Sequence, residues 1–296
     1  MMKIKERRKF NHLICIVLTL FLLSCSGSDL SEDPTVEASS VSNTAFSENT
    51  KYEINLEMEG KTFQKNVLIE DYTGAWCGWC PRVTHAIEEV NKTTENVIAV
   101  AIHELDSLQN QFTRKMRLLF DVDNFPTAYI DRKYVWDFPE PDNLDQVIDL
   151  INTNAPLGIK LSSTVSGNLM KIKATIGFGT TISKGLKFTL MAIEDGVRKV
   201  QLNYTDYFGE VTKIDKFVNN DVLRFVFSEE ISGGIMSNSR TIKGAIIEKT
   251  FESNVPDYIE DVASLSFVAV VSYADTNEVL NAREVKVNES NDFQNN

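Results

Sequence analysis

Two cysteines separated by two residues carry the clearest chemical signal in the sequence. They stand in the run Trp76-Cys77-Gly78-Trp79-Cys80-Pro81. Thiol–disulfide exchange needs a thiolate that attacks and a second sulfur close by that resolves the mixed disulfide. The first turn of a helix brings sulfurs at this spacing within bonding distance, and its positive end lowers the pKa of a thiol. The motif therefore predicts a redox-active disulfide, with Cys77 attacking at a helix start and Cys80 resolving inside the first turn.

A zinc site is the main alternative for such a cysteine pair. Structural zinc takes four ligands, commonly two cysteine pairs or one pair with two histidines. The chain holds four cysteines, but Cys15 and Cys25 fall in an N-terminal targeting segment, and His85 and His103 do not have zinc-finger spacing. We therefore expect no metal and no cofactor. His85 is interpreted as an exposed helix residue and His103 as a capped residue at a strand end.

The residues around the motif predict a strand before it and a helix after it. Apolar residues recur at i, i+4 and i+7 in Val83, Ile87 and Val90, as on one face of a helix. Val97–Ile102 is a continuous apolar run, which is typical of a central strand covered on both faces. Further elements are expected around Leu108–Leu119 (helix), 128–136 (hairpin) and 144–151 (helix). Strands alternating with helices over residues 51–154 predict an α/β layer architecture.

From about Leu157 the apolar pattern changes to a period of two. Alternating segments occur at Met170–Phe178, Leu186–Ala192, Leu223–Phe227 and Phe267–Tyr273. Several short alternating strands joined by polar turns are typical of a β-sandwich. The change of period predicts a domain boundary near 155, a β-sandwich domain over residues 155–290, and a disordered tail at 291–296.

The N-terminal residues predict export and lipid attachment. A basic start precedes Leu13–Leu23, an apolar run too short to cross a bilayer, so residues 1–24 are interpreted as a signal peptide. Leu22-Leu23-Ser24-Cys25 resembles a bacterial lipobox, which implies cleavage before Cys25 and acylation of that residue; the alternative is an ordinary signal peptide that contains a cysteine. Ser26 after the cysteine favours the outer membrane, by analogy with sorting rules in double-membraned bacteria.

The mature chain is strongly acidic and begins with a polar segment. Residues 1–24 hold five of the 30 basic and one of the 42 acidic residues, so the remainder carries a net charge of −16. Such a charge repels nucleic acid, and we expect no nucleic-acid partner. Residues 26–50 are rich in Ser, Glu, Asp, Asn and Thr, a composition that buries too little surface to order itself. Residues 25–50 are therefore predicted to be the lipidated cysteine and a flexible tether.

The segment from Val67 to Pro81 resembles the thioredoxin superfamily. In that family a buried carboxylate assists proton transfer to the resolving thiol, and Asp71 stands at the matching position. A desolvated carboxyl group has a raised pKa and can deprotonate Cys80 through water. The alternative is that Asp71 ends a strand with a solvated side chain.

The same resemblance implies a substrate groove. Phe125-Pro126-Thr127 precedes a strand where these folds place a cis-proline loop that faces the active cysteines; an ordinary trans proline is the alternative. Pro126 would expose backbone that pairs with a substrate chain, and Phe125 would shape the groove. Trp76 and Trp79 would flank the sulfurs as an apolar rim for extended polypeptide, although Trp79 could equally pack over the helix end.

Most of the mature chain resembles a family of thioredoxin-like outer-membrane lipoproteins named after a 28-kilodalton outer-membrane protein. These join a lipobox, a Trp-Cys-Gly-Trp-Cys-Pro domain and a C-terminal β domain. Glu194–Val197 and Val222–Arg224 are similar to their β-domain signatures. Where a histidine is expected before the second signature the chain has Asn219-Asn220-Asp221, which speaks against a metal or proton role there.

Two functions fit these features. The first is a membrane-anchored thiol–disulfide oxidoreductase that acts on thiols and disulfides of exported proteins, together with a separate redox partner. The second is a surface lipoprotein that binds a ligand and keeps a redox-inert thioredoxin-like scaffold. In both, the lipid at Cys25 holds the protein to the membrane, and the sequence does not set the direction of exchange.

Overall fold

The computed structural model describes residues 46–296, which belong to one compact unit. The predicted signal peptide, the acylation site Cys25 and the predicted tether up to position 45 lie outside the described residues. No helix between positions 46 and 296 is long and apolar enough to span a membrane.

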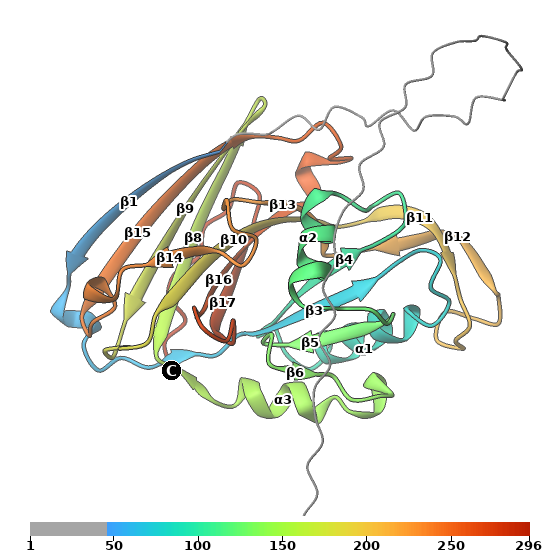
Figure 1. Ribbon diagram of the computed structural model, residues 1–296, viewed down its shortest axis with the longest axis horizontal. Helices are drawn as coiled ribbons and strands as arrows, with labels where there is room; N and C mark the ends of the chain where they lie inside the picture. The colour runs from blue at the N-terminus through green and yellow to red at the C-terminus, as the bar shows by residue number, and fades with distance from the viewer. Residues whose placement is uncertain (1–45) are drawn as a thin grey trace, which may run out of the picture. The chain divides into compact units, whose positions relative to one another are not determined.

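The fold is rich in β-strands and holds few helices (Figure 1). A nine-stranded sheet has the order β17-β16-β10-β13-β4-β3-β5-β6, with β14 paired to β10 beside that path. Its strands are β3 (Val67–Thr73), β4 (Val97–His103), β5 (Thr127–Ile130), β6 (Tyr134–Val135), β10 (Leu186–Glu194), β13 (Val222–Val226), β14 (Gly234–Met236), β16 (Leu265–Tyr273) and β17 (Val279–Lys286).

The other strands form one four-stranded sheet and two pairs. The four-stranded sheet has the order β1-β15-β9-β8 and consists of β1 (Phe46–Ile54), β8 (Leu157–Ser166), β9 (Leu169–Phe178) and β15 (Ala245–Asn254). The pairs are β2 (Phe63–Gln64) with β7 (Asn154–Ala155), and β11 (Val197–Leu202) with β12 (Lys213–Asn219).

Three α-helices accompany the strands, and all lie in the first part of the described chain. They are α1 (Pro81–Asn91), α2 (Gln111–Leu119) and α3 (Asp145–Ile151), and the sequence patterns predicted each of them. Short 3-10 helices are η1 (Leu56–Met58), η2 (Glu140–Asp142), η3 (Asn238–Arg240) and η4 (Val262–Ser264).

The parallel pair β3–β4 lies in the middle of the large sheet and is buried on both faces. The register runs from Val67 opposite Val97 to Thr73 opposite His103. Apolar residues of α1 and α3 pack with Val67 and Ile69 on one face, while α2 packs with residues such as Leu68 on the other. Because both faces are covered, β3 and β4 read as continuous rather than alternating apolar runs.

Strands from both sides of the predicted boundary at residue 155 join the same sheet. β13 pairs in parallel with β4 through Val222 opposite Ala101, and it pairs antiparallel with β10 on its other side. The sheet therefore continues from the helix-containing part of the chain into the part that consists of strands and 3-10 helices. The separation into domains over residues 51–154 and 155–290 stays a prediction.

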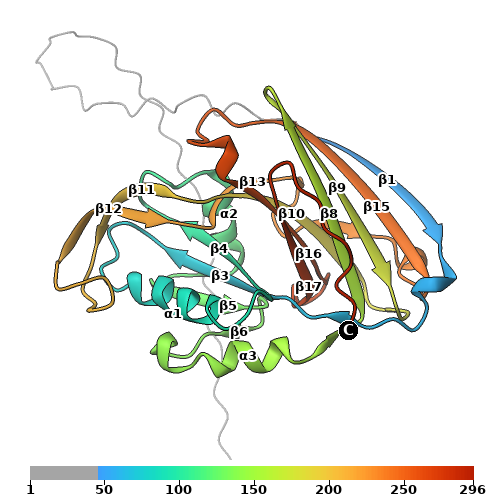
Figure 2. The same cartoon turned by 180° about the vertical axis from the view of Figure 1, so that it is seen from behind.

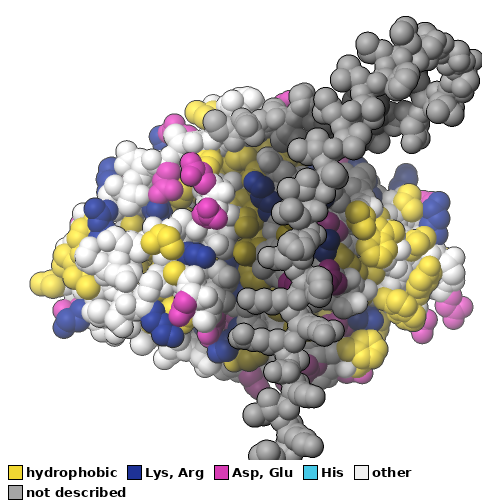
Figure 3. All heavy atoms as spheres, in the orientation of Figure 1, with side chains coloured by type: hydrophobic (Ala, Val, Ile, Leu, Met, Phe, Trp, Pro, Cys, Tyr) yellow, Lys and Arg dark blue, Asp and Glu magenta, His cyan; other side chains and the backbone are white. Residues whose placement is uncertain are grey.

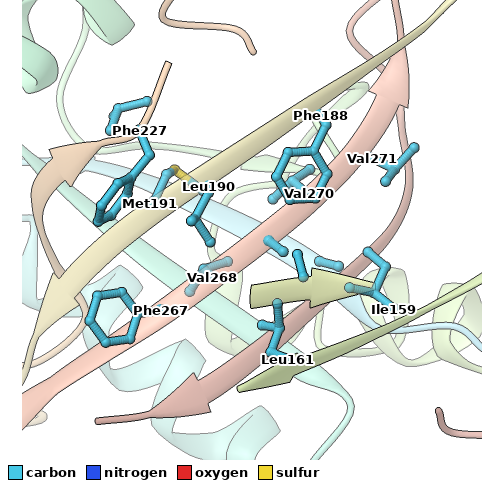
Figure 4. Close-up of a cluster of buried hydrophobic side chains, with 14 of the residues drawn as sticks. Ile159, Leu161, Phe188, Leu190, Met191, Phe227, Phe267, Val268, Val270 and Val271 are labelled. Atoms are coloured by element: carbon cyan, nitrogen blue, oxygen red, sulfur yellow. The ribbon is translucent and has the colours of Figure 1, made fainter. Parts of the chain in front are cut away.

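The four-stranded sheet packs over the part of the large sheet that contains β10 and β16. Ile159 and Leu161 of β8 lie against apolar side chains of those strands, among them Leu190 and Val268 (Figure 4). The alternation of apolar residues that predicted these strands directs one face of each into this core.

The end of the predicted tether is part of a strand. Residues 46–50, which the composition assigns to the tether, form the first half of β1 and pair antiparallel with β15, with Phe46 opposite Ser253 and Ile54 opposite Ala245. Most β1 side chains are exposed and many are polar, so the composition of this segment does not predict a strand. The strand is held by main-chain hydrogen bonds to β15, and these do not depend on the side chains of the segment.

The C-terminal residues are ordered, so the predicted disorder at 291–296 is wrong. The Asn291 amide donates a hydrogen bond to the Leu161 carbonyl oxygen (2.9 Å), and the Phe293 ring lies 5.8 Å from the Phe63 ring, centroid to centroid. The tail gains its order from strands that are distant in sequence, and its own residues are too few and too polar to show this.

Candidate functional site

Cys77 and Cys80 form a disulfide between the end of β3 and the start of α1, with their Cα atoms 5.4 Å apart. The helix begins at Pro81 and Cys80 is its N-cap, so both cysteines precede the helix rather than occupy its first turn as predicted. Proline is favoured at the first helical position because it has no N–H to leave unpaired. A tight turn over residues 74–80 places the two sulfurs together, with the Cys77 amide donating to the Gly74 carbonyl oxygen (2.9 Å).

The cysteines are enclosed while the flanking tryptophans are open. Cys77 is 5% exposed and Cys80 1% exposed, whereas Trp76 and Trp79 are 43% and 53% exposed. Hydrophobic side chains gather at the end of the molecule where this loop and the β11–β12 hairpin lie (Figures 1 and 3). The site therefore offers an aromatic surface beside a shielded disulfide.

Asp71 lies in β3, six residues before Cys77, and its side chain is buried. The residue is 3% exposed, and its Oδ1 atom has no hydrogen-bond partner within residues 46–296. Burial raises the pKa of the Asp71 carboxyl group well above its ordinary value; the charge of Glu140 adds to this rise and that of Arg82 opposes it. The solvated strand end that was the alternative interpretation is therefore wrong.

Asp71 and Cys80 line the same small cavity, of about 70 Å³. A carboxyl group that lines the same cavity as Cys80 can exchange a proton with that residue through water. The geometry therefore brings together the two residues that the sequence assigned to that step.

The Phe125–Pro126 peptide bond is cis, as the resemblance implies. β5 follows directly and pairs antiparallel with β3, with Thr127 opposite Tyr72, so the proline loop lies at the same end of β3 as the cysteines. The Phe125 ring contacts the Trp76 ring edge-on, with centroids 5.4 Å apart. Trp76 also donates from Nε1 to the Glu104 carbonyl oxygen (2.8 Å), which fixes the orientation of its ring.

The β11–β12 hairpin covers the cysteine loop, and the sequence did not predict this. The amides of Leu202 and Tyr204 donate to the carbonyl oxygens of Ala75 (2.9 Å) and Gly78 (2.7 Å). These two bonds hold the end of β11 and the segment that follows it against the cysteine loop. In Figure 2 the hairpin extends beside the start of α1.

Gln201 of the hairpin is buried against the same loop. Its Nε2 atom donates to the carbonyl oxygens of Cys77 (2.9 Å) and Gly74 (3.3 Å). The Trp79 ring meets the Tyr204 ring edge-on at 5.9 Å, so Trp79 packs on the hairpin and still remains half exposed. No short motif marks these contacts, because each joins residues more than a hundred positions apart.

The two histidines have separate surroundings. The His85 ring stacks on Tyr207 of the hairpin loop, with centroids 4.2 Å apart, so it is less open than an exposed helix residue. His103 is buried at the end of β4, where a hydrogen bond of 2.7 Å joins its Nδ1 to Asp106 Oδ2. No group of three or more His, Cys, Asp or Glu residues in the described part of the chain is arranged to hold a metal ion.

Asp106 is a further residue that supports the cysteine loop. Its Oδ2 accepts the Ala75 amide (2.8 Å) as well as the His103 bond. Burial alone would raise the pKa of Asp106, but the hydrogen bonds from His103 and from backbone amides lower it below its ordinary value. Asp106 is therefore suited to accept these bonds as a charged carboxylate.

Comparisons with known proteins assign the chain to a family. The model of the outer membrane protein Omp28 family matches residues 113–291, and the chain belongs to that family. The prediction that the protein is located at the outer membrane, held there by a lipid, agrees with this membership, while Cys25 itself lies outside the described residues.

Two further similarities to known proteins are more limited: one covers a single segment of the chain, and the other concerns the fold. A stretch of 65 residues, which is 22% of the chain, is 38% identical to protein disulfide isomerase-like 1-1 of Arabidopsis thaliana and to a protein disulfide-isomerase of Datisca glomerata. The match spans only 12% of the length of each of these two relatives. The solved structure of HBP35 of Porphyromonas gingivalis is similar in fold, with a TM-score of 0.61, 17% identity and 77% of each chain covered.

Proposed function

We propose that the protein is a membrane-anchored thiol–disulfide oxidoreductase that acts on exported proteins through Cys77 and Cys80. The proposal includes a thioredoxin-like unit over residues 51–154 and a β-sandwich unit over residues 155–290. The observation that carries it is the Cys77–Cys80 disulfide at a strand-to-helix junction. The buried Asp71, whose Oδ1 atom has no hydrogen-bond partner in the described part of the chain, lines the same cavity as Cys80. The segment that is similar to disulfide isomerases supports the same chemistry.

The exchange runs through a mixed disulfide. In the reduced protein the Cys77 thiolate attacks a substrate disulfide, and one substrate sulfur leaves as a thiolate that takes a proton from solvent. Asp71 then accepts the proton of the Cys80 thiol, and the Cys80 thiolate attacks the Cys77 sulfur. The Cys77–Cys80 bond forms, the bond from Cys77 to the substrate breaks, and the substrate is reduced by two electrons. The reverse sequence oxidises a substrate dithiol, and a separate redox partner restores the starting state.

The substrate chain lies, in this proposal, along the surface formed by Trp76, Phe125 and Pro126. Trp76 and Phe125 contact each other and leave apolar surface exposed next to the cysteines. The proline loop lies at the same end of β3 as the cysteines, and in this proposal its backbone pairs with extended polypeptide. Trp79 borders the other side of the loop against Tyr204.

A second candidate is a surface binding protein whose disulfide is inert. The observation that favours it is the enclosure of both cysteines beneath the β11–β12 hairpin, which holds the loop through backbone and Gln201 hydrogen bonds. A disulfide of this kind resists attack if the hairpin does not move.

A redox titration of the full lipoprotein in detergent separates the two candidates. The oxidoreductase predicts a Cys77–Cys80 pair that equilibrates with glutathione buffers and an insulin-reducing activity that Cys77→Ser abolishes. Lys51→Ala changes an exposed side chain of β1, so it serves as the control and is expected to keep that activity. A pair that stays oxidised throughout the titration, with no insulin reduction, would support the binding protein instead.

Trapping identifies the physiological substrates. Without the resolving thiol, Cys80→Ala should accumulate mixed disulfides between Cys77 and exported proteins in whole cells, and Cys77→Ala should accumulate none. The captured chains report whether disulfides are reduced or formed.

A further inference from the structure

An open groove borders the cysteine loop at Trp79, and the proposed exchange does not use it. Its volume of about 720 Å³ lies within the range of about 300–1,000 Å³ that ligand sites occupy. It is lined by Trp79 and Arg82 at the start of α1, by Phe138 and Pro139 of the loop before α3, and by residues 204–207 of the hairpin. These segments lie at one end of the molecule (Figure 2).

The aromatic side chains of the groove are held in place although solvent reaches them. Phe138 is 74% exposed, and roughly half of each of Trp79, Tyr204 and Tyr207 is exposed. The Trp79 ring meets the Tyr204 ring with centroids 5.9 Å apart, and the Tyr207 ring stacks on His85 at 4.2 Å. Exposed apolar side chains that gather in one patch mark binding surfaces in soluble proteins.

The loop that carries Phe138 is fixed by two side chains. Asn143 Nδ2 donates to the carbonyl oxygens of Asp137 (3.2 Å) and Pro139 (2.9 Å). The Arg82 guanidinium lies over the Phe138 ring, 4.5 Å from its centroid. A groove whose walls are already fixed loses little conformational entropy when a partner binds, so this groove is preformed for a ligand.

The groove carries one unbalanced charge, and that charge is negative. Arg82 lines the groove, but its Nε and Nη2 atoms bond to the carboxyl oxygens of Glu140, so the two charges balance. Asp206 is exposed, and its carboxylate makes no hydrogen bond or ion pair within residues 46–296. The excess of acidic over basic residues in the chain also favours a basic partner.

We propose that this groove binds an arginine or lysine side chain of the polypeptide whose disulfide the protein exchanges. An aromatic face attracts a cation within about 6 Å of the ring centre, and the Asp206 carboxylate supplies the opposite charge. Because Trp79 lines the groove and stands two residues from Cys77, a chain bonded to Cys77 lies beside it. The inference rests on the proposed exchange and adds a substrate class, an extended chain with a basic residue near its cysteine.

A set of short peptides, titrated against the full lipoprotein in detergent with its disulfide intact, tests the proposal. Their sequence is Gly-Ser-X-Ser-Gly with blocked ends, where X is arginine, citrulline, norleucine or glutamate. Citrulline has the shape of arginine without the charge, so the arginine peptide should bind about tenfold more tightly and should shift the indole N–H NMR signal of Trp79. Equal affinity for the citrulline peptide, tighter binding of the norleucine or glutamate peptide, or no shift at Trp79 would overturn the proposal.

Variants locate the effect. Asp206→Asn should remove the preference for arginine over citrulline, whereas Asp215→Asn should keep it, since Asp215 lies on the same hairpin but contacts Lys213 (3.0 Å). Tyr207→Leu keeps an apolar side chain and removes an aromatic face, so the arginine affinity should fall several-fold. Tyr52→Leu changes an exposed ring of β1 and should have no effect. An equal loss of preference in Asp215→Asn and Asp206→Asn would trace it to net charge and overturn the site.

The redox titration separates this inference from the proposed function, because the peptides contain no cysteine and their binding needs no exchange. An arginine preference that depends on Asp206, in a protein whose Cys77–Cys80 pair stays oxidised in every glutathione buffer, would overturn the exchange and leave a binding site for basic polypeptide. A pair that exchanges, in a protein without arginine preference, would overturn the groove alone.

Discussion

The amide nitrogen of Tyr204 lies 2.7 Å from the carbonyl oxygen of Gly78, the residue that directly follows Cys77. This hydrogen bond ties the tip of the β11–β12 hairpin to the turn that holds the disulfide. The Tyr204 ring also lies against the open side of Gly78 and against Trp79. The access of any thiol to Cys77 and Cys80 therefore depends on how firmly this hairpin is held.

Gly78→Ala should weaken that attachment. A Cβ atom at position 78 would lie 2.4 Å from Cδ2 and 2.6 Å from Cγ of Tyr204. Cγ of Tyr204 is only two bonds from the backbone, so the ring cannot move away unless the hairpin backbone moves with it. Overpacking of this kind typically costs about 1–3 kcal/mol, so we expect lower stability in urea unfolding. We also expect faster alkylation of Cys77 in the reduced protein, because the displaced hairpin no longer covers it.

The double variant Gly78→Ala/Tyr204→Ala tests the cause. Removing the ring should recover part of the lost stability, as a double-mutant cycle measures. Gly234→Ala is the matched control, because a Cβ atom there meets no atom within 4 Å. Additive effects of the Gly78 and Tyr204 changes would show that the contact between them does not hold the hairpin.

Gln201→Glu should release the hairpin without changing its shape. The Nε2 atom of Gln201 donates to the carbonyl oxygens of Cys77, Gly74 and Leu202, and a carboxylate has no hydrogen to donate. Leaving buried carbonyl groups unsatisfied costs about 1–3 kcal/mol, measured by urea unfolding. Gln146→Glu removes a donor from a less buried site and should cost less. Equal losses in the two variants would argue against a special role for Gln201.

Asp71→Asn should change the pH dependence of stability. The pKa of Asp71 is higher in the folded protein than its ordinary value of 3.8, so the folded state binds the proton more tightly than the unfolded state. Its contribution to stability is complete below the unfolded pKa and is lost as the pH rises through the folded pKa. Asparagine does not titrate, so the stability of Asp71→Asn relative to the wild type should increase as the pH rises from about 4.

Urea unfolding at a series of pH values measures this difference. Asp215→Asn, an exposed carboxylate on the hairpin, should follow the wild-type curve closely. If the difference in the free energy of unfolding between Asp71→Asn and the wild type did not change with pH, Asp71 would have the same pKa in the folded and the unfolded state. The same variant should slow the resolution of mixed disulfides, because Cys80 loses its proton acceptor.

Arg132→Met should strongly destabilise the protein. Arg132 and Glu70 are fully buried, with Nη2 2.8 Å and Nε 2.9 Å from Glu70 Oε1. Removing one partner leaves the other charge buried and alone, which costs about 3–5 kcal/mol. The double variant Glu70→Leu/Arg132→Met should be more stable than Arg132→Met. Lys133→Met breaks the exposed pair with Glu278 and should cost less than about 1 kcal/mol.

Local sequence patterns were sufficient for the elements that carry the cysteines. The apolar period predicted α1, a continuous apolar run predicted β4, and the residues before the cysteine motif predicted the strand β3, because the signal for each element lies within its own residues. The same holds for α2, α3 and the alternating strands β9, β10 and β16. The spacing of Cys77 and Cys80 likewise pointed to a disulfide at a strand-to-helix junction, and the structure contains it one turn earlier than expected.

Contacts between distant residues decided the rest. The pairing of β13 with β4, the order of the tail around Phe293 and the strand β1 all depend on partners far along the chain. Tyr204 and Asp221 belong to the surroundings of the disulfide only because the hairpin folds over the loop. Hydrogen bonds and desolvation act through space, so a linear pattern determines which residues can react, while the tertiary structure determines which groups shield them and hold their protons.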